Sequence, residues 1–385
     1  MKTSIAGNWR LAKITTILLL CFIASFVSAE ELKDFNKSDN NYKYTKKRII
    51  DANFNTSDAY SLSLYGKFSD YEISTWNENQ VGFHVEIVTK SNKEEKAEDL
   101  LRQIDIEFNH SKTDKKIVAK TVLPNKMNNV EFQIDYYIMI PKNISLLIDN
   151  SYGDINIDRL DKYLDLDLDY GSFSIDSLLA DNKIDVCYGN AKIKYAEKVD
   201  AKISYGNVRV NTGDDVNVNL RYGNGKFGEI KNLKAFCQYS DVSCSDIDSA
   251  SLKVQYTDTY LKNVNDVTID GSYSDVEIDY LLKKINFFST YGDIEINKVS
   301  QDFEVIDIKT VYSDVDVVFL ESHRFSYNIS VSYGDIDGDL LKDNARRYIK
   351  ENNEITVIGN FNDDNEEHQI KVDMKYGDFE LEFKE

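Results

Sequence analysis

A short motif recurs twelve times between residues 152 and 376: a Tyr, then Gly, Ser or Thr, then Asp, Asn or Ser. The first eight intervals between successive Tyr residues are 17 or 18 residues long, two intervals of 21 follow, and the last is 43. A fixed period this short is typical of a solenoid, in which each repeat packs only against its neighbours. The tyrosines of the series are Tyr152, Tyr170, Tyr188, Tyr205, Tyr222, Tyr239, Tyr256, Tyr273, Tyr291, Tyr312, Tyr333 and Tyr376.

Apolar residues alternate with polar ones on both sides of the motif. The residues two, four and six positions before Tyr170 are Leu168, Leu166 and Leu164, and the pattern resumes after it with Phe173 and Ile175. A period of two predicts strands with one buried face. The inward parity changes across the motif, so the chain turns a corner there.

Gly, Asn and Asp tolerate left-handed backbone angles, which suits them to such a corner. The parity of the Tyr residues places their rings with the core row, as a packed corner stack. Besides the twelve tyrosines, the predicted structural ladder includes Gly153, Asp154, Gly171, Gly189, Gly206, Gly223, Gly292, Gly334 and Gly377.

The predicted fold is all-β: a parallel β-helix, or β-solenoid, of two-strand rungs of about 17–18 residues. We expect it to span residues 144–385, behind a small α+β cap over residues 30–143 that covers the open N-terminal edge. Within the cap, Phe68 replaces the Tyr of an outlying corner. Ser91 and Glu94 predict a capping box at the start of a helix, one face of which carries Ala97, Leu100, Leu101 and Ile104. Residues 341–365 interrupt the last interval and predict a loop or a short helix.

Residues 1–29 have the form of a signal peptide. Lys2, Arg10 and Lys13 precede an apolar run that ends at a small-residue site, so we expect cleavage after Ala29 and export to the periplasm, the outer surface or the medium. An uncleaved anchor and a lipoprotein at Cys21 are the alternatives. The apolar run is short for a membrane span, and a large residue precedes Cys21.

Charge and cysteines narrow the possible partners. The formal net charge is −20, and removing the three basic residues of the signal peptide would bring it near −23, which disfavours nucleic acid. No membrane span is expected in the mature chain.

Cys237 and Cys244 fall at core positions and Cys187 on the outward face, three rungs away from Cys237, so no disulfide is expected.

The sequence contains no convincing catalytic, cofactor or metal site. The Asp and Asn residues of the corners could ligate calcium or could bond to the backbone, and the second interpretation is favoured because calcium repeats have a denser consensus. The Tyr ladder could also be a sugar-stacking platform, although its parity favours packing. The four His residues share no ligand spacing.

One outward column carries segregated charge. Four residues after the Tyr, successive rungs carry Lys192, Arg209 and Lys226, and later rungs carry Glu277, Glu295, Asp316 and Asp337. Stacked like charges repel, so the basic stripe is a candidate binding site for a surface ligand, either glycan or protein, or for the acidic stripe of another copy. The alternative is chance on a solvated face.

The chain resembles the bacterial putative-adhesin family of exported parallel β-helices, in its Bacteroidetes-type branch. Besides the Tyr-Gly-Asp rungs, the resemblance rests on Ile73-Ser74-Thr75-Trp76, Glu95 to Leu101, Val118-Ala119-Lys120-Thr121 and Ile140-Pro141-Lys142-Asn143. It implies a β-helical fold and offers no catalytic residues.

The resulting functional hypothesis is an exported β-solenoid that acts as an adhesin-like interaction or structural module without catalysis. A polysaccharide-acting β-helix enzyme is one alternative, which would need a groove formed by long loops. A periplasmic envelope-stress or regulatory accessory protein is the other.

Overall fold

A computed structural model describes residues 42–127, 130–362 and 367–384. The predicted signal peptide, residues 1–29, lies outside the described residues. The chain divides into two compact units after Tyr42, and the fold below is that of the second unit, residues 43–385. Among the residues described, no helix is long and apolar enough to cross a membrane.

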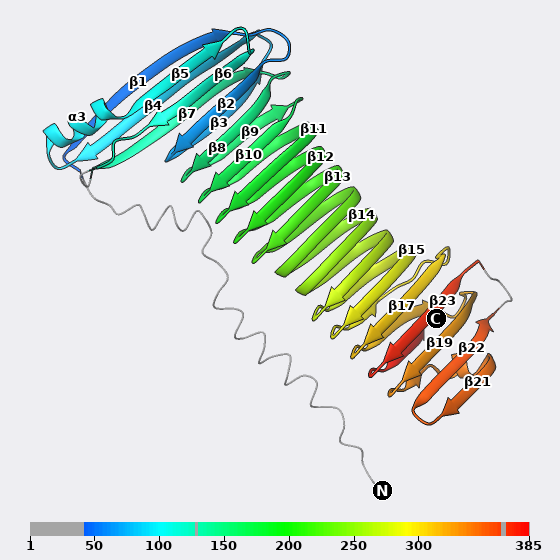
Figure 1. Ribbon diagram of the computed structural model, residues 1–385. Coiled ribbons are helices and arrows are strands. Elements are labelled where there is room, and N and C mark those ends of the chain that lie inside the picture. Colours follow the sequence, from blue (N-terminus) through cyan, green and yellow to red (C-terminus); the bar gives the residue numbers. More distant parts are fainter. Residues whose placement is uncertain (1–41, 128–129, 363–366, 385) are drawn as a thin grey trace. The chain divides into compact units, whose positions relative to one another are not determined.

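The second unit is a stack of parallel two-strand rungs (Figure 1), as predicted. The strand that follows each Tyr lies in a first layer, and the strand that precedes the next Tyr lies in a second layer. In the middle rungs one long strand continues from the first layer into the second. These strands are β11 (Phe173–Cys187), β12 (Ala191–Ser204), β13 (Val208–Arg221), β14 (Asn224–Ser272), which spans three rungs, and β15 (Val276–Thr290).

Toward both ends, the two halves of a rung are separate strands. In the first layer they are β3 (Ser69–Trp76), β9 (Ile155–Leu160), β16 (Ile294–Ile296), β18 (Val315–Leu320), β20 (Ile336–Asp337) and β24 (Phe379–Lys384). In the second layer they are β2 (Ser61–Lys67), β8 (Ser145–Ser151), β10 (Leu164–Asp169), β17 (Val305–Val311), β19 (Phe325–Ser332) and β23 (Gln369–Lys375).

The core lies between the layers and consists of ladders of apolar side chains in register. One ladder runs Val186, Ile203, Leu220 and Cys237, each paired with the next across one rung and each fully buried. Burying such a side chain contributes about 1.5–3 kcal/mol. One rung alone cannot bury its apolar row, so the stability of the stack comes from the contacts between rungs.

Antiparallel strands and a helix complete the N-terminal end. In the first layer, β7 (Glu131–Pro141) pairs with β3 and is followed by β4 (Gln80–Ser91) and β1 (Tyr44–Asn55). In the second layer, the hairpin of β5 (Asp105–Ser111) and β6 (Lys116–Val122) pairs with β2. The predicted division at residues 143 and 144 stays a prediction.

The predicted helix is present as α3 (Glu94–Gln103), and it buries Ala97 and Leu100. The expected capping box is wrong. The N-cap is Lys93, which makes no side-chain cap bond, while Ser91 is the last residue of β4 and its hydroxyl accepts the Lys93 N–H.

The C-terminal rung is stacked out of sequence order. β23 lies between β17 and β19, and β24 lies between β18 and β20. The residues predicted to interrupt the last interval form a short helix, α4 (Asp339–Asp343), and a hairpin of β21 (Ala345–Glu351) and β22 (Glu354–Phe361) that pairs with β19. The 43-residue interval therefore contains both an inserted hairpin and a return to an earlier position.

Candidate functional site

The motif tyrosines form one continuous stack on the outside of the corner. From Tyr152 through Tyr312 to Tyr376, neighbouring ring centroids lie 4.7–5.2 Å apart and the ring planes differ by at most 9°. Phe68 extends the stack beyond Tyr152, as its outlying corner predicted, and Tyr333 extends it beyond Tyr376.

The expectation that these rings belong to the core row is wrong. The twelve tyrosines are 37–54 % exposed, and each has a φ of 50–63°. The left-handed backbone at the Tyr turns its side chain outward. This conformation costs a non-Gly residue about 1–2 kcal/mol. Stacking on two neighbours, at about 0.5–1.5 kcal/mol for each aromatic pair, offsets that cost.

The stack is poorly shaped as a sugar platform. A sugar binds an aromatic side chain through the ring face, but within the stack each face is covered by the next ring at about 5 Å. Ring edges and hydroxyl groups are what the stack presents to solvent.

Where Gly follows the Tyr, it permits close backbone approach and does not supply the backbone angle. Among the described glycines only Gly338 has a left-handed φ, so our expectation that the corner glycines supply that bend is wrong. A Cβ on Gly206 would lie 1.6 Å from the carbonyl oxygen of Gly189, and a Cβ on Gly223 would lie 1.7 Å from that of Gly206. Successive rungs therefore touch at this column.

The residues two positions after each Tyr stack in one column, and side-chain-to-backbone hydrogen bonds join most neighbours in it, as favoured from the sequence. The N–H of Asn224 donates to Asn207 Oδ1 (2.9 Å), and the N–H of Asp293 donates to Asp275 Oδ1 (2.9 Å). Asn and Asp perform this role equally, so it does not require a negative charge. These bonds join three runs, Asp70 to Ser172, Asn190 to Asn224, and Asp275 to Asp335. We call the whole column the corner ladder, and its members in spatial order are Asp70, Asp154, Ser172, Asn190, Asn207, Asn224, Asp241, Asp258, Asp275, Asp293, Asp314, Asp378 and Asp335.

The charged column predicted from the sequence is part of a longer row across the outer face of the first layer, which we call the outer row. The strand register joins its members from β1 to β20, and the 17-residue spacing places Ser243 and Tyr260 within β14. In order they are Asp51, His84, Tyr137, Glu72, Asn156, Ser174, Lys192, Arg209, Lys226, Ser243, Tyr260, Glu277, Glu295, Asp316, Glu380 and Asp337.

The basic segment of the outer row lacks ion pairs. Lys192, Arg209 and Lys226 are exposed neighbours in register, and no ion pair or hydrogen bond of their side chains occurs within the described part of the chain. Lysines of other outward columns behave differently. Each of the following pairs with an Asp of a neighbouring rung: Lys183, Lys194, Lys198, Lys202 and Lys231.

The acidic segment contains one residue that sequence order hid. Glu380 lies between Asp316 and Asp337, because the C-terminal rung is inserted there. Burial, reinforced by the negative charges of Glu380 and Asp314, raises the pKa of Asp316 to about 6. Glu380 lies four residues after Tyr376, as the other acidic residues of this segment lie four residues after their own Tyr. The repeat therefore predicted that Glu380 belongs to the outer row, but it could not predict which residues are its neighbours there.

A shallow groove of ≈ 710 Å³ lies between the outer row and the corner ladder. Its lining extends from Lys226 through Ser243 and Tyr260 to Glu277 and Asp316, and includes Asp241, Asp258 and Asp275 of the corner ladder. Ser243 provides little bulk there, so the surface is hollowed where the row changes from basic to acidic.

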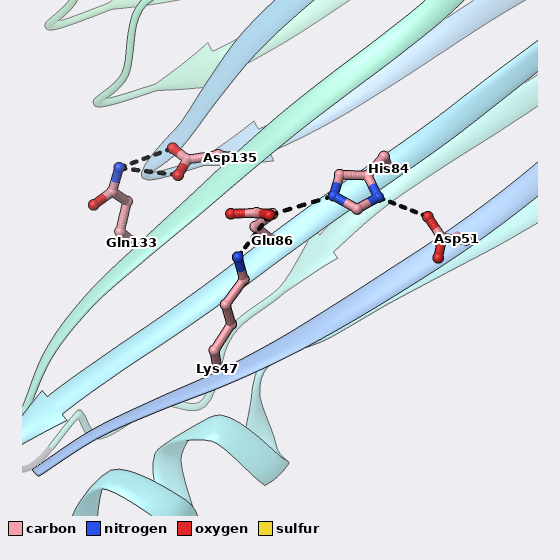
Figure 2. Close-up of polar contacts among 6 residues, drawn as sticks. All are labelled: Lys47, Asp51, His84, Glu86, Gln133 and Asp135. Atoms are coloured by element: carbon pink, nitrogen blue, oxygen red, sulfur yellow. Dashed lines mark hydrogen bonds and ion pairs between the residues drawn. The ribbon is translucent and has the colours of Figure 1, made fainter.

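A polar cluster occupies the β1 end of the outer row (Figure 2). His84 Nδ1 lies 2.7 Å from Asp51 Oδ1, and His84 Nε2 lies 3.3 Å from Glu86 Oε1, which also pairs with Lys47 at 2.7 Å. Beside it, Gln133 Nε2 donates to both carboxylate oxygens of Asp135. The bond to Asp51, and then the bond to Glu86, raises the pKa of His84.

This geometry does not suit general-base catalysis. Both ring nitrogens of His84 face carboxylates, so the imidazolium form satisfies both contacts and leaves no ring nitrogen for a substrate. The charged groups of the cluster stabilise one another across β1 and β4.

The described residues offer little support for a metal site or a reactive cysteine. Within them, no group of three or more His, Cys, Asp or Glu side chains is arranged to hold a metal ion. Cys237 and Cys244 are buried as predicted, Cys187 is partly exposed, and all three are free thiols. Burial raises the pKa of Cys237 to about 12, which makes its thiol unreactive.

Comparison with protein families identifies one match over most of the chain. The model of the family described as Toastrack DUF4097 matches residues 70–382. No curated protein matches.

Three solved structures resemble parts of the fold at 11% sequence identity. A putative cell adhesion protein from Clostridium sporogenes ATCC 15579 has a TM-score of 0.19 over 88% of this chain and 100% of its own. A putative adhesin from Bacteroides fragilis NCTC 9343 has a TM-score of 0.34 over 60% of this chain and 98% of its own. A putative lipid binding protein from Parabacteroides distasonis ATCC 8503 has a TM-score of 0.18 over 88% and 97%. Likenesses at this level carry no argument about function.

Proposed function

Because the chain belongs to the Toastrack DUF4097 family, we propose that it is an exported, non-catalytic, adhesin-like module that binds a partner at the cell envelope or cell surface. The binding surface is the outer row of the first layer, and the basic segment of Lys192, Arg209 and Lys226 is its contact site for an acidic partner.

The observation that carries this proposal is the unpaired basic segment. Two unit charges at about 4 Å repel by about 1 kcal/mol in water, and stacked rungs hold such charges only slightly farther apart. Elsewhere the same solenoid alternates Lys with Asp across rungs, which removes the repulsion, as in the pair of Lys202 and Asp185 at 2.7 Å. A partner of opposite charge would relieve the repulsion in the outer row.

The charge of the corner ladder changes along the stack in the same direction as the charge of the outer row. Next to the three basic rungs it contains Asn190, Asn207 and Asn224, and next to the acidic rungs it contains Asp. Since Asn and Asp make the same backbone bond, this choice adjusts charge and not structure. The outer row and the corner ladder have different structural roles but become acidic in the same part of the stack. This favours a binding surface over a chance pattern of charges.

Export is the second part of the proposal and rests on the signal-peptide form of residues 1–29. The intact mass of the protein recovered from the host should correspond to a chain that begins at Glu30. Protease treatment of intact cells should remove the protein if it lies on the outer surface and should spare it in the periplasm.

Binding is tested with two matched triple variants. Changing Lys192, Arg209 and Lys226 to Gln removes the basic segment. Changing Lys183, Lys198 and Lys202 to Gln removes the same charge from columns of the second layer. We expect the first variant to lose most of its binding to whole cells and to a polyuronate matrix at about 0.05 M salt, and the second to retain it. Equal binding by both variants would contradict the proposed surface.

A further inference from the structure

The charges of the outer row are antisymmetric about one point in the stack. Counting rungs outward from the boundary between Ser243 and Tyr260, the second, third and fourth positions on one side are Lys226, Arg209 and Lys192. The same positions on the other side are occupied by Glu277, Glu295 and Asp316. The fifth positions are Ser174 and Glu380, and the sixth are Asn156 and Asp337.

Such a row is complementary to a reversed copy of itself. If two first layers pack face to face and are related by a twofold axis parallel to the strands at this boundary, every basic residue meets an acidic one. The pairs are Lys226 with Glu277, Arg209 with Glu295, and Lys192 with Asp316, each made twice. A twofold axis along the stack would instead place Lys192 against Lys192, so the charges select the antiparallel arrangement.

The shape of the surface agrees with this arrangement. The groove crosses the boundary between Ser243 and Tyr260, so the axis would pass through it, and it extends farther on the acidic side, to Asp316, than on the basic side, to Lys226. Because the rung spacing is identical in both copies, the match persists along the row, whereas an acidic glycan would account only for the basic segment.

The corner ladder faces its own reversed copy in the same way. Asn190, Asn207 and Asn224 would lie opposite Asp314, Asp293 and Asp275, which brings no like charges together. Two like-charged pairs form, Asp241 with Asp258 next to the axis and Asp154 with Asp335 at the sixth positions. Desolvation, and then the charges of Asp275 and Asp241, raise the pKa of Asp258.

We propose that this protein forms a symmetric antiparallel dimer through the first layer, with the twofold axis between Ser243 and Tyr260. This deepens the proposed function, on whose interaction surface it rests, by naming a second copy as a partner. The contact is polar and wet, so dimerisation weakens with salt, because the screening length falls from about 10 Å at 0.1 M to about 3 Å at 1 M.

The test is sedimentation equilibrium of the exported protein with two charge-reversed variants. One variant carries Lys192→Glu, Arg209→Glu and Lys226→Glu, and the other carries Glu277→Lys, Glu295→Lys and Asp316→Lys. The parent should dimerise at about 0.05 M salt and dissociate at least tenfold more readily at about 0.5 M. Each variant alone should be monomeric, and an equimolar mixture should form a heterodimer, because every position then faces the opposite charge.

A second measurement avoids reversing any charge. On a Cys187→Ser background, Ser243→Cys places a thiol beside the axis, so a short bismaleimide should link two copies. Asn156→Cys places it many rungs from its symmetry mate and should give no dimer.

The outcomes separate the two proposals. A monomeric parent at low salt that still binds cells overturns the dimer and leaves the binding surface intact. A dimer that persists in both variants shows that the contact is made elsewhere, and this overturns the proposed dimer. A mixture that stays monomeric also overturns the proposed dimer, because the opposite charges then do not pair. Loss of cell binding in a variant that still dimerises overturns the dimer and supports the binding surface, because the outer row then contacts the cell and not a second copy.

Discussion

Tyr312 stacks on Tyr376, which lies 64 residues later in the sequence, with ring centroids 4.7 Å apart and ring planes 7° from parallel. Tyr333, only 21 residues after Tyr312, stacks instead on the far side of Tyr376. The aromatic stack therefore follows spatial order and not chain order. The same insertion brings Glu380 next to Asp316 and lengthens the acidic segment of the outer row.

The left-handed conformation of the stacked tyrosines gives an unusual order of stabilities at one position. Tyr222→Ala should lose about 1–3 kcal/mol of stacking and keep the backbone strain, whereas Tyr222→Gly loses the same stacking and relieves about 1 kcal/mol of strain. Glycine should therefore be the better replacement, contrary to its usual effect in strands. Urea unfolding of the two variants measures this order, and an alanine variant as stable as the glycine variant would remove the strain argument.

Close approach of the rungs predicts that corner glycines tolerate no side chain. Gly206→Ala places a Cβ 1.6 Å from the carbonyl oxygen of Gly189, so we expect a loss of about 3 kcal/mol or more. Gly271→Ala is the matched control, because its nearest atom is Ser289 Oγ at 3.4 Å, an ordinary contact. Melting temperatures of the two variants should differ clearly, and similar values would mean that the column can spread.

Asp316 should make the protein less stable as pH rises. Its pKa is raised to about 6 in the folded state, so between its ordinary value near 4 and about 6 the folded state binds more protons than the unfolded state. Stability due to this group therefore falls across that window and stays low above it. Asp316→Asn should raise the melting temperature at about pH 7.5 and have little effect at about pH 4. Glu229→Gln is the control for the change in net charge, and the comparison of the two variants at both pH values isolates the effect of position 316.

His84 should also make the protein less stable as pH rises, but in a higher pH range. Its pKa is raised by its contacts with Asp51 and Glu86, so the stabilisation is fully present below the ordinary value of about 6.5 and is lost as pH rises through the folded-state pKa. Amide exchange in β1 should therefore accelerate above that range in the parent protein. His84→Gln should exchange at a rate without this step, and a retained step in the variant would assign it to another group.

Thiol labelling should distinguish the three cysteines of residues 42–385. Cys187 is partly exposed, whereas Cys237 and Cys244 are fully buried within the core. Treatment of the native protein with an iodoacetamide reagent should modify Cys187 alone, and slowly, because burial and the nearby Asp169 and Asp185 raise its pKa. Rapid modification of Cys237 would mean that the core opens on the labelling timescale.

The regular features of this protein could be predicted from the sequence because they are local and repeated. The 17-residue period and the alternation around Tyr170 determine strands, a corner and inward ladders that end in buried residues such as Cys237. The charged segment at Lys192, Arg209 and Lys226 was visible for the same reason, since equal positions in equal rungs must stack.

Two errors at the corner arose because residue type is ambiguous there. Gly tolerates left-handed angles and also permits close approach, and only the structure shows that Gly206 serves the second purpose. Tyr rarely adopts a left-handed φ, so parity placed Tyr222 inside, whereas the stacking of its ring on neighbouring rings outweighs the backbone cost.

Sequence alone determined the repeat, its inward faces and its charged column, because each depends only on spacing along the chain. Tertiary structure decided the order in which the last rungs stack, the outward Tyr ladder, and the continuation of the outer row through β3, β7, β4 and β1 to Asp51. These depend on which strand edges meet, and hydrogen bonding between edges is equally satisfied by near and distant segments. The choice among them is made by packing at the ends of the stack, where the repeat no longer specifies the neighbour.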